Sequence, residues 1–312
     1  MVRELCRFEF LACIFATIVL PGAARSAPFE VRNGDRIVFV GGTFIERMQQ
    51  FGYLETLLTV AHPEMRITFR NLGWSGDTVW GDSRALFGTQ IDGYNRLVND
   101  VKEAKPSVLV ICYGANEAHA GEPGLRRFVD GFNHLLDDLA STKARLVLLS
   151  PHAYAVGPAG TPEPTVYNTK LKLYCRAIEQ LAKERDACYV SLFDLMDVMQ
   201  NSPTRVGTQT LTDSGMHLTD NGYRMAAFEI AKRLGIDLPE LNFAVPDQRI
   251  AELQAAIQLK NEFYFHRYRP QNETYLFLFR KHEQGNNAVE IPQFDPLVEE
   301  QEKRIAVLNG SK

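Results

Sequence analysis

Short apolar runs alternate with longer amphipathic stretches through the middle of the chain, and this alternation is what most constrains the fold. The runs that predict strands are residues 36–40, 65–70, 107–113, 145–149 and 188–193. The stretches that predict helices are 44–60, one opening at Pro123, one through Tyr167 and Leu181, and about 220–234 after a Thr219 cap. Such alternation indicates βαβ units on a mostly parallel sheet with helices on both faces. Functional residues are then expected beyond the carboxyl ends of the strands.

The first residues have the pattern of a targeting segment. Arg3 and Arg7 give a positive start, residues 10–20 form an apolar run too short to span a bilayer comfortably, and small residues follow near Ser26. We therefore predict a signal peptide over 1–26, with a buried N-terminal helix as the alternative. The mature protein is expected to be exported from a bacterial cell, periplasmic or secreted, without stable membrane insertion.

The charge of the chain and the spacing of its residues argue against nucleic acid, metal and cofactor as ligands. The chain has 312 residues and a formal net charge of −4, and no basic block stands out, so nucleic acid is not expected as a partner. Cys112, Cys175 and Cys188 have no regular spacing and read as free thiols. Neither a metal-ligand spacing nor a phosphate-binding loop is visible, so we expect no metal and no cofactor. The sequence does not indicate an oligomeric state.

The alternation of strand-like and helix-like stretches ends after about residue 240. We predict a main domain over 27–240 and an extension over 241–312 that packs on it. The extension reads as a helix leading into aromatic residues, then a partly extended and partly irregular stretch, then a short charged helix. Its aromatic residues are too many for a free tail.

Polar clusters follow the predicted strands. Gly41-Gly42-Thr43 comes after the first strand and has the layout of a nucleophile elbow, in which glycines permit a tight turn that exposes a hydroxyl. The alternative is that Thr43 caps the next helix, because Glu46 lies at capping-box spacing. The next clusters are Asn-Leu-Gly-Trp-Ser-Gly-Asp at 71–77 and Gly-Ala-Asn-Glu at 114–117. The last cluster, 211–219, precedes the final helix.

These clusters resemble, in order, the four blocks of the SGNH or GDSL-type esterases and acylhydrolases. Residues 71–77 resemble the family's N-x-G-x-S-G-D block, 114–117 its G-x-N-D block, and 213–217 its D-x-x-H block. The resemblance implies a three-layer α/β/α, flavodoxin-like fold with a mostly parallel five-stranded sheet. Two positions depart from the family pattern. Thr43 stands where the family has serine. Ser214 stands three residues before His217, where the family has aspartate.

The resemblance also implies roles for individual residues. Thr43 is the predicted nucleophile, and His217 is the general base. Gly76 and Asn116 are the predicted oxyanion donors, which agrees with the two uncharged N–H donors of an asparagine side chain. Asp213, one position earlier than the family's aspartate, is predicted to orient the imidazole, and Gly215 would ease the offset.

Each of these residues also has a structural, non-catalytic alternative. Asn116 is alternatively a loop-bracing residue, His217 a structural histidine and Asp213 a turn residue. A third version of the enzyme hypothesis moves the nucleophile to Ser75 or Ser214. Three further residues are candidates to line a substrate cleft: Glu117, His119 and His152.

The function predicted from the sequence is ester hydrolysis through an acyl-enzyme. The expected substrate is a small-molecule or carbohydrate ester, with a short acyl group such as acetyl on a carbohydrate as the first choice. The alternative is a catalytically inactive protein of the same fold that binds a glycan or a protein partner. It is motivated by the departures at Thr43 and Ser214.

Overall fold

The computed structural model describes residues 29–157, 163–200, 210–239, 241, 243 and 246–310. The predicted signal peptide lies outside the described residues. A five-stranded parallel sheet forms the centre, in the order β2-β1-β3-β4-β5. The predicted α/β architecture is therefore confirmed. The strands are β1 (Arg36–Gly41), β2 (Thr68–Asn71), β3 (Val108–Cys112), β4 (Arg145–Leu149) and β5 (Cys188–Val190).

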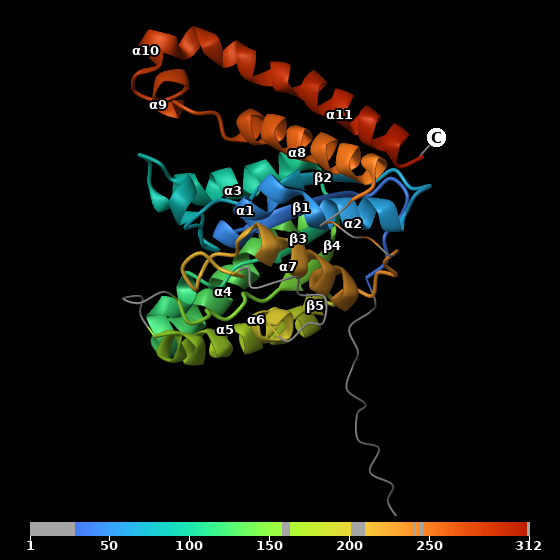
Figure 1. The fold of residues 1–312 in the computed structure, drawn as a ribbon. Coiled ribbons are helices and arrows are strands. Elements are labelled where there is room, and N and C mark those ends of the chain that lie inside the picture. The colour runs from blue at the N-terminus through green and yellow to red at the C-terminus, as the bar shows by residue number, and fades with distance from the viewer. Residues whose placement is uncertain are drawn as a thin grey trace, which may run out of the picture.

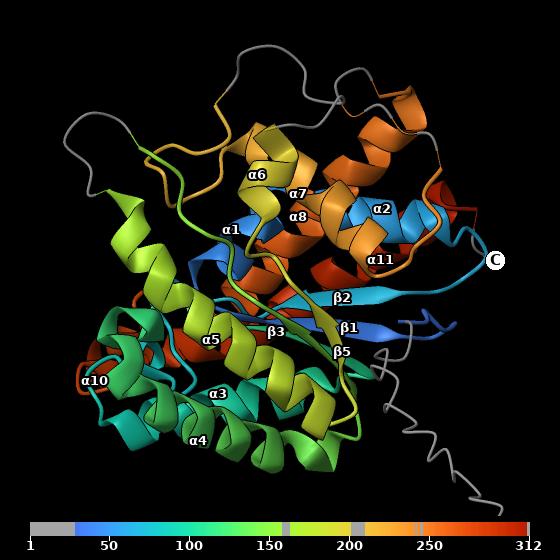
Figure 2. The same cartoon turned by 90° about the horizontal axis from the view of Figure 1, so that it is seen from below.

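Helices cover both faces of this sheet. Alternate strand residues point to opposite sides, so that Ile37 and Phe39 belong to one apolar core while Val38 and Val40 belong to the other. The helices of the first face are α1 (Thr43–Phe51), α2 (Tyr53–Ala61), α6 (Leu195–Gln200) and α7 (Asp220–Arg233). Those of the second are α3 (Gln90–Ala104), α4 (Gly121–Leu139) and α5 (Pro164–Glu184). Figure 2 shows the two layers on either side of the strands.

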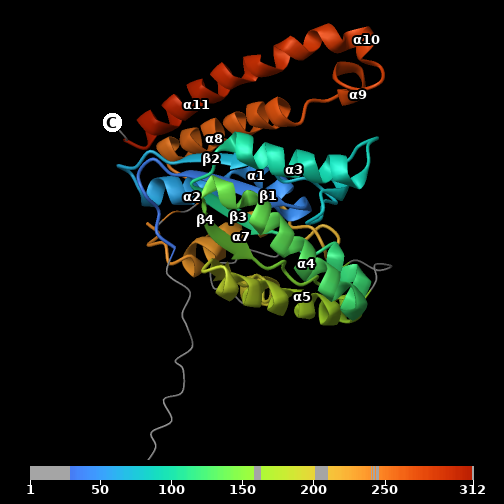
Figure 3. The same ribbon diagram turned by 180° about the vertical axis from the view of Figure 1, so that it is seen from behind.

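The C-terminal helices cover the open edge of the sheet. The long helix α8 (Gln248–Tyr268) packs against α1, α2 and β2, and α11 (Phe294–Leu308) packs along its outer side (Figures 1 and 3). An uncovered edge strand offers unpaired backbone groups, and here β2 is shielded by protein. The short segments between them are α9 (Glu273–Leu276), α10 (Lys281–Gln284) and the 3₁₀ helix Gly285–Gln293. Other 3₁₀ turns are Asp82–Arg84, Glu117–Ala120 and Ala140–Thr142.

Several predicted elements differ from the observed ones. The single helix predicted over 44–60 is wrong: it is two helices, because Gly52 has a φ of 65°, a left-handed conformation that ends α1 and turns the chain into α2. The extended stretch predicted after α8 is also wrong, since short helices occupy that region. Helices α3 and α6 were not among those predicted, although Thr89 and Asp92 form a capping box at the start of α3.

The boundary predicted near residue 240 falls where several residues are not described, so the division into a domain and an extension stays a prediction. No helix among the described residues is both long enough and apolar enough to cross a membrane.

Candidate active site

The hydroxyl of Thr43 lies at the carboxyl end of β1, in the first turn of α1. The N-cap of α1 is Gly42, and no side chain caps the helix, so the interpretation of Thr43 as a helix cap is wrong. Glu46 does not complete a capping box either, because its carboxylate accepts hydrogen bonds from the backbone and hydroxyl of Ser75. Thr43 Oγ1 instead accepts from the backbone N–H of Gly76 at 3.4 Å. The hydroxyl thus faces a backbone donor supplied by the loop after β2.

Asn116 follows β3, the strand beside β1 in the sheet. Its side-chain amide donates one hydrogen bond to the backbone oxygen of Asp77 at 2.7 Å, so it does brace the neighbouring loop. An amide nitrogen carries two N–H groups, which leaves a second donor. A β-carbon at Gly42 would lie 3.5 Å from the same nitrogen, so the glycine keeps the space beside this donor open.

His217 lies in a short loop, residues 213–217, that we call the histidine loop. The loop is closed on itself because the backbone N–H of Asp213 donates to the backbone oxygen of His217 at 3.0 Å. Burial, and then the positive charge of Arg47, lower the pKa of His217, while the charge of Asp213 acts in the opposite direction. The imidazole is therefore neutral, and able to accept a proton, at lower pH than an ordinary histidine.

The carboxylate of Asp213 points to Arg47, whose two terminal nitrogens lie 3.1 Å from one carboxylate oxygen. The other oxygen accepts the hydroxyl of Ser214 at 2.8 Å. No hydrogen bond within the described residues joins this carboxylate, or the hydroxyl of Thr43, to the imidazole of His217. The orienting role of Asp213 stays a prediction, and Arg47, from α1, is a partner that the sequence analysis did not identify.

Thr43, Asn116 and His217 line one small cavity of about 70 Å³. This volume is far below the roughly 300–1,000 Å³ of pockets that hold drug-sized ligands. The other residues of the cavity wall include Phe44, Tyr113, His152, Tyr154, Met216 and Tyr223. The cavity lies beyond β1 and β3, where the strand order reverses, which is the usual place for a site in an open α/β sheet.

A second imidazole, that of His152, also lines the cavity. Its Nδ1 lies 3.0 Å from the backbone oxygen of Ala153, which can only accept, so Nδ1 donates and Nε2 is left as an acceptor. Burial lowers the pKa of His152, which keeps the ring neutral. Glu117, another cavity residue, accepts from the backbone N–H groups of Val79 and Gly114, and burial raises its pKa to about 7. The third cleft candidate, His119, packs its ring at a tilt against Tyr167 and is not part of the cavity wall.

Residues 71–77, which begin with the last residue of β2 and carry Gly76, are called the glycine loop below. Its last residue, Asp77, is buried and accepts from Arg84 Nε at 2.7 Å and from the hydroxyl of Tyr113 at 2.8 Å. This network was not predicted, because the sequence around Asp77 does not indicate that Arg84 and Tyr113 would face it.

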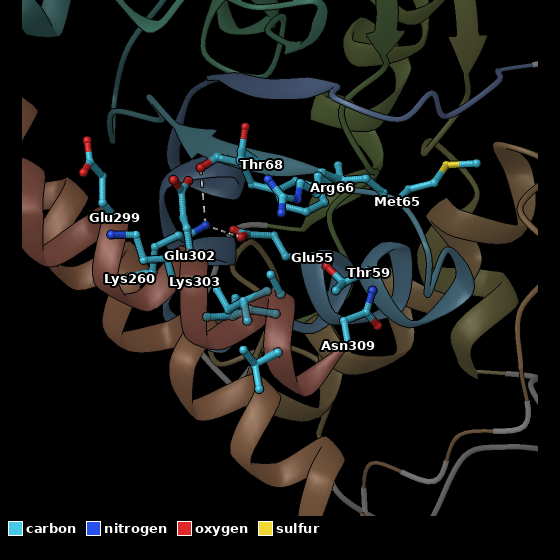
Figure 4. Close-up of a pocket in the computed structure, with 16 residues that line it drawn as sticks. Glu55, Thr59, Met65, Arg66, Thr68, Lys260, Glu299, Glu302, Lys303 and Asn309 are labelled. Atoms are coloured by element: carbon cyan, nitrogen blue, oxygen red, sulfur yellow. Dashed lines mark hydrogen bonds and ion pairs between the residues drawn. The ribbon is translucent and has the colours of Figure 1, made fainter. Parts of the chain in front are cut away.

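A larger cavity of about 510 Å³ lies near the amino end of β2, between α2, α8 and α11 (Figure 4). It contains the buried ion pair of Lys260 with Glu55, whose atoms lie 2.5 Å apart. None of the predicted catalytic residues lines it. Within the described residues, no group of three histidine, cysteine or acidic side chains is arranged to hold a metal ion. Of the predicted catalytic residues, Thr43, Asn116 and His217 line the small cavity, whereas Gly76 and Asp213 are not part of its wall.

A hydroxyl beside backbone and amide donors, with a neutral imidazole on the same cavity wall, is the set of groups that acyl transfer requires. The hydroxyls of Ser75 and Ser214 donate to carboxylates of Glu46 and Asp213, and neither serine lines the small cavity.

The model of the GDSL-like Lipase/Acylhydrolase family matches residues 41–225, which is 185 of 312 residues. No curated protein matches the chain. Among solved structures, a catalytic mutant of Axe2, an acetylxylan esterase from Geobacillus stearothermophilus, is 18% identical, with a TM-score of 0.53 over 68% of this chain and 99% of that one. BT4096, a gut microbial diltiazem-metabolizing enzyme, is 18% identical, with a TM-score of 0.52 over 68% of this chain and 49% of that one.

This chain therefore spans about half the length of BT4096. At these identities the solved structures establish the fold, and the family match covers more than half of the sequence. The chain belongs to the GDSL-like lipase/acylhydrolase family.

Proposed function

We propose that this protein is an ester hydrolase that works through an acyl-enzyme formed on Thr43. The hydroxyl oxygen of Thr43 attacks the ester carbonyl carbon while its proton passes to the imidazole of His217. The N–H of Gly76 and the second amide N–H of Asn116 hold the oxyanion. The alcohol then leaves with the proton from His217, and water, activated by the same imidazole, releases the acid and restores the hydroxyl.

One observation carries this proposal: the N–H of Gly76 already points at Thr43 Oγ1, beside a cavity lined by Asn116 and His217. Because Thr43 Oγ1 already lies next to the N–H of Gly76, the oxygen of an ester carbonyl attacked by Thr43 would need little movement to reach this donor. Membership of a family of lipases and acylhydrolases supports the same reaction class.

For the substrate we propose a short acyl group, such as acetyl, carried by a carbohydrate. The cavity beside Thr43 measures about 70 Å³, which favours a small acyl group. Axe2, a structural neighbour, is described as an acetylxylan esterase, and this chain would act on the same class of ester. Export from the cell, predicted from residues 1–26, would bring the protein to such material.

The second candidate is a protein of this fold that binds a glycan or a protein partner without catalysis. The observation that favours it is the ion pair of Asp213 with Arg47, which draws away the carboxylate expected to orient His217. Without that carboxylate, the imidazole lacks the partner that fixes its tautomer in the Ser-His-Asp template.

Labelling with a fluorophosphonate probe separates the two candidates. The probe reacts with an activated hydroxyl, so the active protein is labelled as wild type and as Thr43→Ser, but not as Thr43→Ala. Labelling of Thr43→Ser alone favours the inactive candidate. Peptide mapping of the adduct adds a further test, because an adduct on Ser75 or Ser214 would contradict the role of Thr43.

Turnover of acetylated polysaccharides and short-chain nitrophenyl esters tests the substrate class, with His217→Ala as the control. We expect acetyl esters to be hydrolysed faster than longer acyl esters. Equal rates for wild type and His217→Ala on every ester would contradict the proposed function.

A further inference from the structure

The glycine loop is held in place from outside the sheet, by the end of α8. The hydroxyl of Tyr268, the last residue of α8, donates to the backbone oxygen of Gly73 at 2.6 Å. Gly73 itself presses on α1, since a β-carbon there would lie 2.3 Å from the backbone nitrogen of Glu46. The loop is therefore enclosed between α1 on one side and α8 on the other.

Glu46 is the centre of the polar contacts in this enclosure. Its carboxylate accepts from the backbone nitrogen and from the hydroxyl of Ser75, each at 2.8 Å. The same carboxylate forms an ion pair with Arg269, the residue after α8. Ser75 precedes Gly76, and Glu46 lies one helical turn after Thr43. The carboxylate of Glu46 thus links Ser75, the residue before Gly76, to α1, the helix that carries the hydroxyl of Thr43.

Trp74 completes the contacts. Its buried ring is covered by the guanidinium of Arg269, 3.9 Å from the ring centroid, and by that of Arg96 at 4.7 Å. Arg96 in turn binds both carboxylate oxygens of Glu273, the first residue of α9, at 2.5 and 2.6 Å. The side chains of Arg269 and Arg96 are 27% and 21% exposed, so these cation–π contacts are partly shielded from water.

We propose that Tyr268 and Arg269 of the C-terminal segment are positioning residues that set the glycine loop, and with it the N–H of Gly76, against Thr43. This inference rests on the proposed ester hydrolysis for its effect on rate. Gly76 is exposed and has a φ of 76°, so it has no packed side chain of its own to hold it. On one side of Gly76, the buried Asp77 is held by Arg84 and Tyr113. On the other side, Ser75 and Trp74 are held by Glu46 and Arg269, and this second restraint comes from the C-terminal segment.

A donor that meets the oxyanion only in the transition state changes kcat rather than KM when it is displaced. Misplacement of reacting groups by about 1 Å costs roughly 100-fold in rate. We therefore expect Arg269→Ala to lower kcat by between about 10- and 100-fold, with KM changed by less than about twofold. Arg269→Lys keeps the charge but not the planar guanidinium over the ring of Trp74, and its kcat is expected to lie between those of the wild type and Arg269→Ala.

Arg267 provides a matched control. It lies two residues away and forms exposed ion pairs with Glu103 and Asp295, away from the glycine loop. Arg267→Ala removes the same kind of side chain from the same helix end and is expected to leave kcat unchanged. Equal losses of kcat in Arg267→Ala and Arg269→Ala would reduce the role of Arg269 to general stability and overturn the proposal.

Amide hydrogen exchange tests the positioning without any catalysis. In the full chain, Arg269→Ala is expected to speed exchange at residues 73–77 by at least about 10-fold, with Arg267→Ala like the wild type at these residues. Unchanged exchange in Arg269→Ala overturns the proposal. Wild-type protein with neither turnover nor labelling, but with the expected contrast in exchange, overturns the proposed function and leaves the positioning of the loop standing.

Discussion

The glycine loop and the histidine loop meet at the same cavity but are held by different means. In the glycine loop, Asp77 is buried with Arg84, and Ser75 is fixed by Glu46. In the histidine loop, the main side-chain contact is the pair of Arg47 with Asp213, whose side chain is 43% exposed. Exposed ion pairs contribute little, because water screens them, whereas buried polar networks hold their members in one arrangement. The donor half of the site is thus built rigidly, and the acid–base half is held loosely.

The largest effect is expected from the histidine itself. His217→Ala removes the base, and kcat/KM for a short-chain acetyl ester should fall by about 10⁴-fold or more. The control is the fold of the variant, measured by circular dichroism and thermal unfolding. A variant that folds and retains a tenth of the wild-type rate would show that His217 is not the base.

The donor half is tested by Asn116→Ala. Removal of one oxyanion donor costs about 10²–10³-fold in kcat, and KM should stay within about twofold. Asn116→Asp, which keeps the size of the side chain but neither donor, is the second variant. Because both changes also remove the hydrogen bond to the backbone oxygen of Asp77, thermal unfolding of each variant is measured beside kcat. If both variants keep wild-type kcat, the oxyanion is held elsewhere.

Asp213→Asn is expected to have a smaller effect, below about 10-fold in kcat/KM. The reason is that the carboxylate is engaged by Arg47 and Ser214 rather than by the imidazole. In a triad whose aspartate holds the histidine, the same change costs about 10⁴-fold. A loss of that size here, measured by steady-state kinetics, would mean that Asp213 does orient His217. The histidine loop would then be held as firmly as the glycine loop.

The smallest effect is a shift in the titration of His217. Burial first, and then the charge of Arg47, disfavour the imidazolium and lower the pKa of His217. Arg47→Met should therefore raise this pKa, and the acid limb of the pH profile of kcat/KM should move to higher pH. The measurement is an NMR titration of the ring, with Arg126→Met, on the exposed side of α4, as the control. A pKa that stays constant or falls in Arg47→Met would contradict this electrostatic account.

The sequence predicted the fold well where burial on both faces leaves a continuous apolar signal, as in β3 and β4. It failed where one residue's backbone conformation decides the outcome. Gly52 divides a helix that is periodic on both sides of it, and periodicity does not report a left-handed φ. The clusters that carry the hydroxyl, amide and imidazole were recognised from their places after strands and before the last helix. The individual residues were assigned through the resemblance to the SGNH family, and their catalytic roles stay predictions.

The contacts between these groups were beyond the sequence. Asp213 and Arg47 are 166 residues apart, and spacing within the block around His217 says nothing about an arginine on α1. Likewise, the sequence predicted that residues after 240 carry helices, but not that Arg269 would reach Glu46, 223 residues earlier.

The sequence by itself determined the alternating strands and helices, and with them the edge of the sheet at which Thr43, Asn116 and His217 gather, because local apolar patterns and parallel connections dictate both. Only the tertiary structure decided which partners hold those groups. Side-chain pairing across long separations depends on how α8 packs against the edge of the sheet and on where each side chain then points, and neither is encoded in any short stretch of the chain.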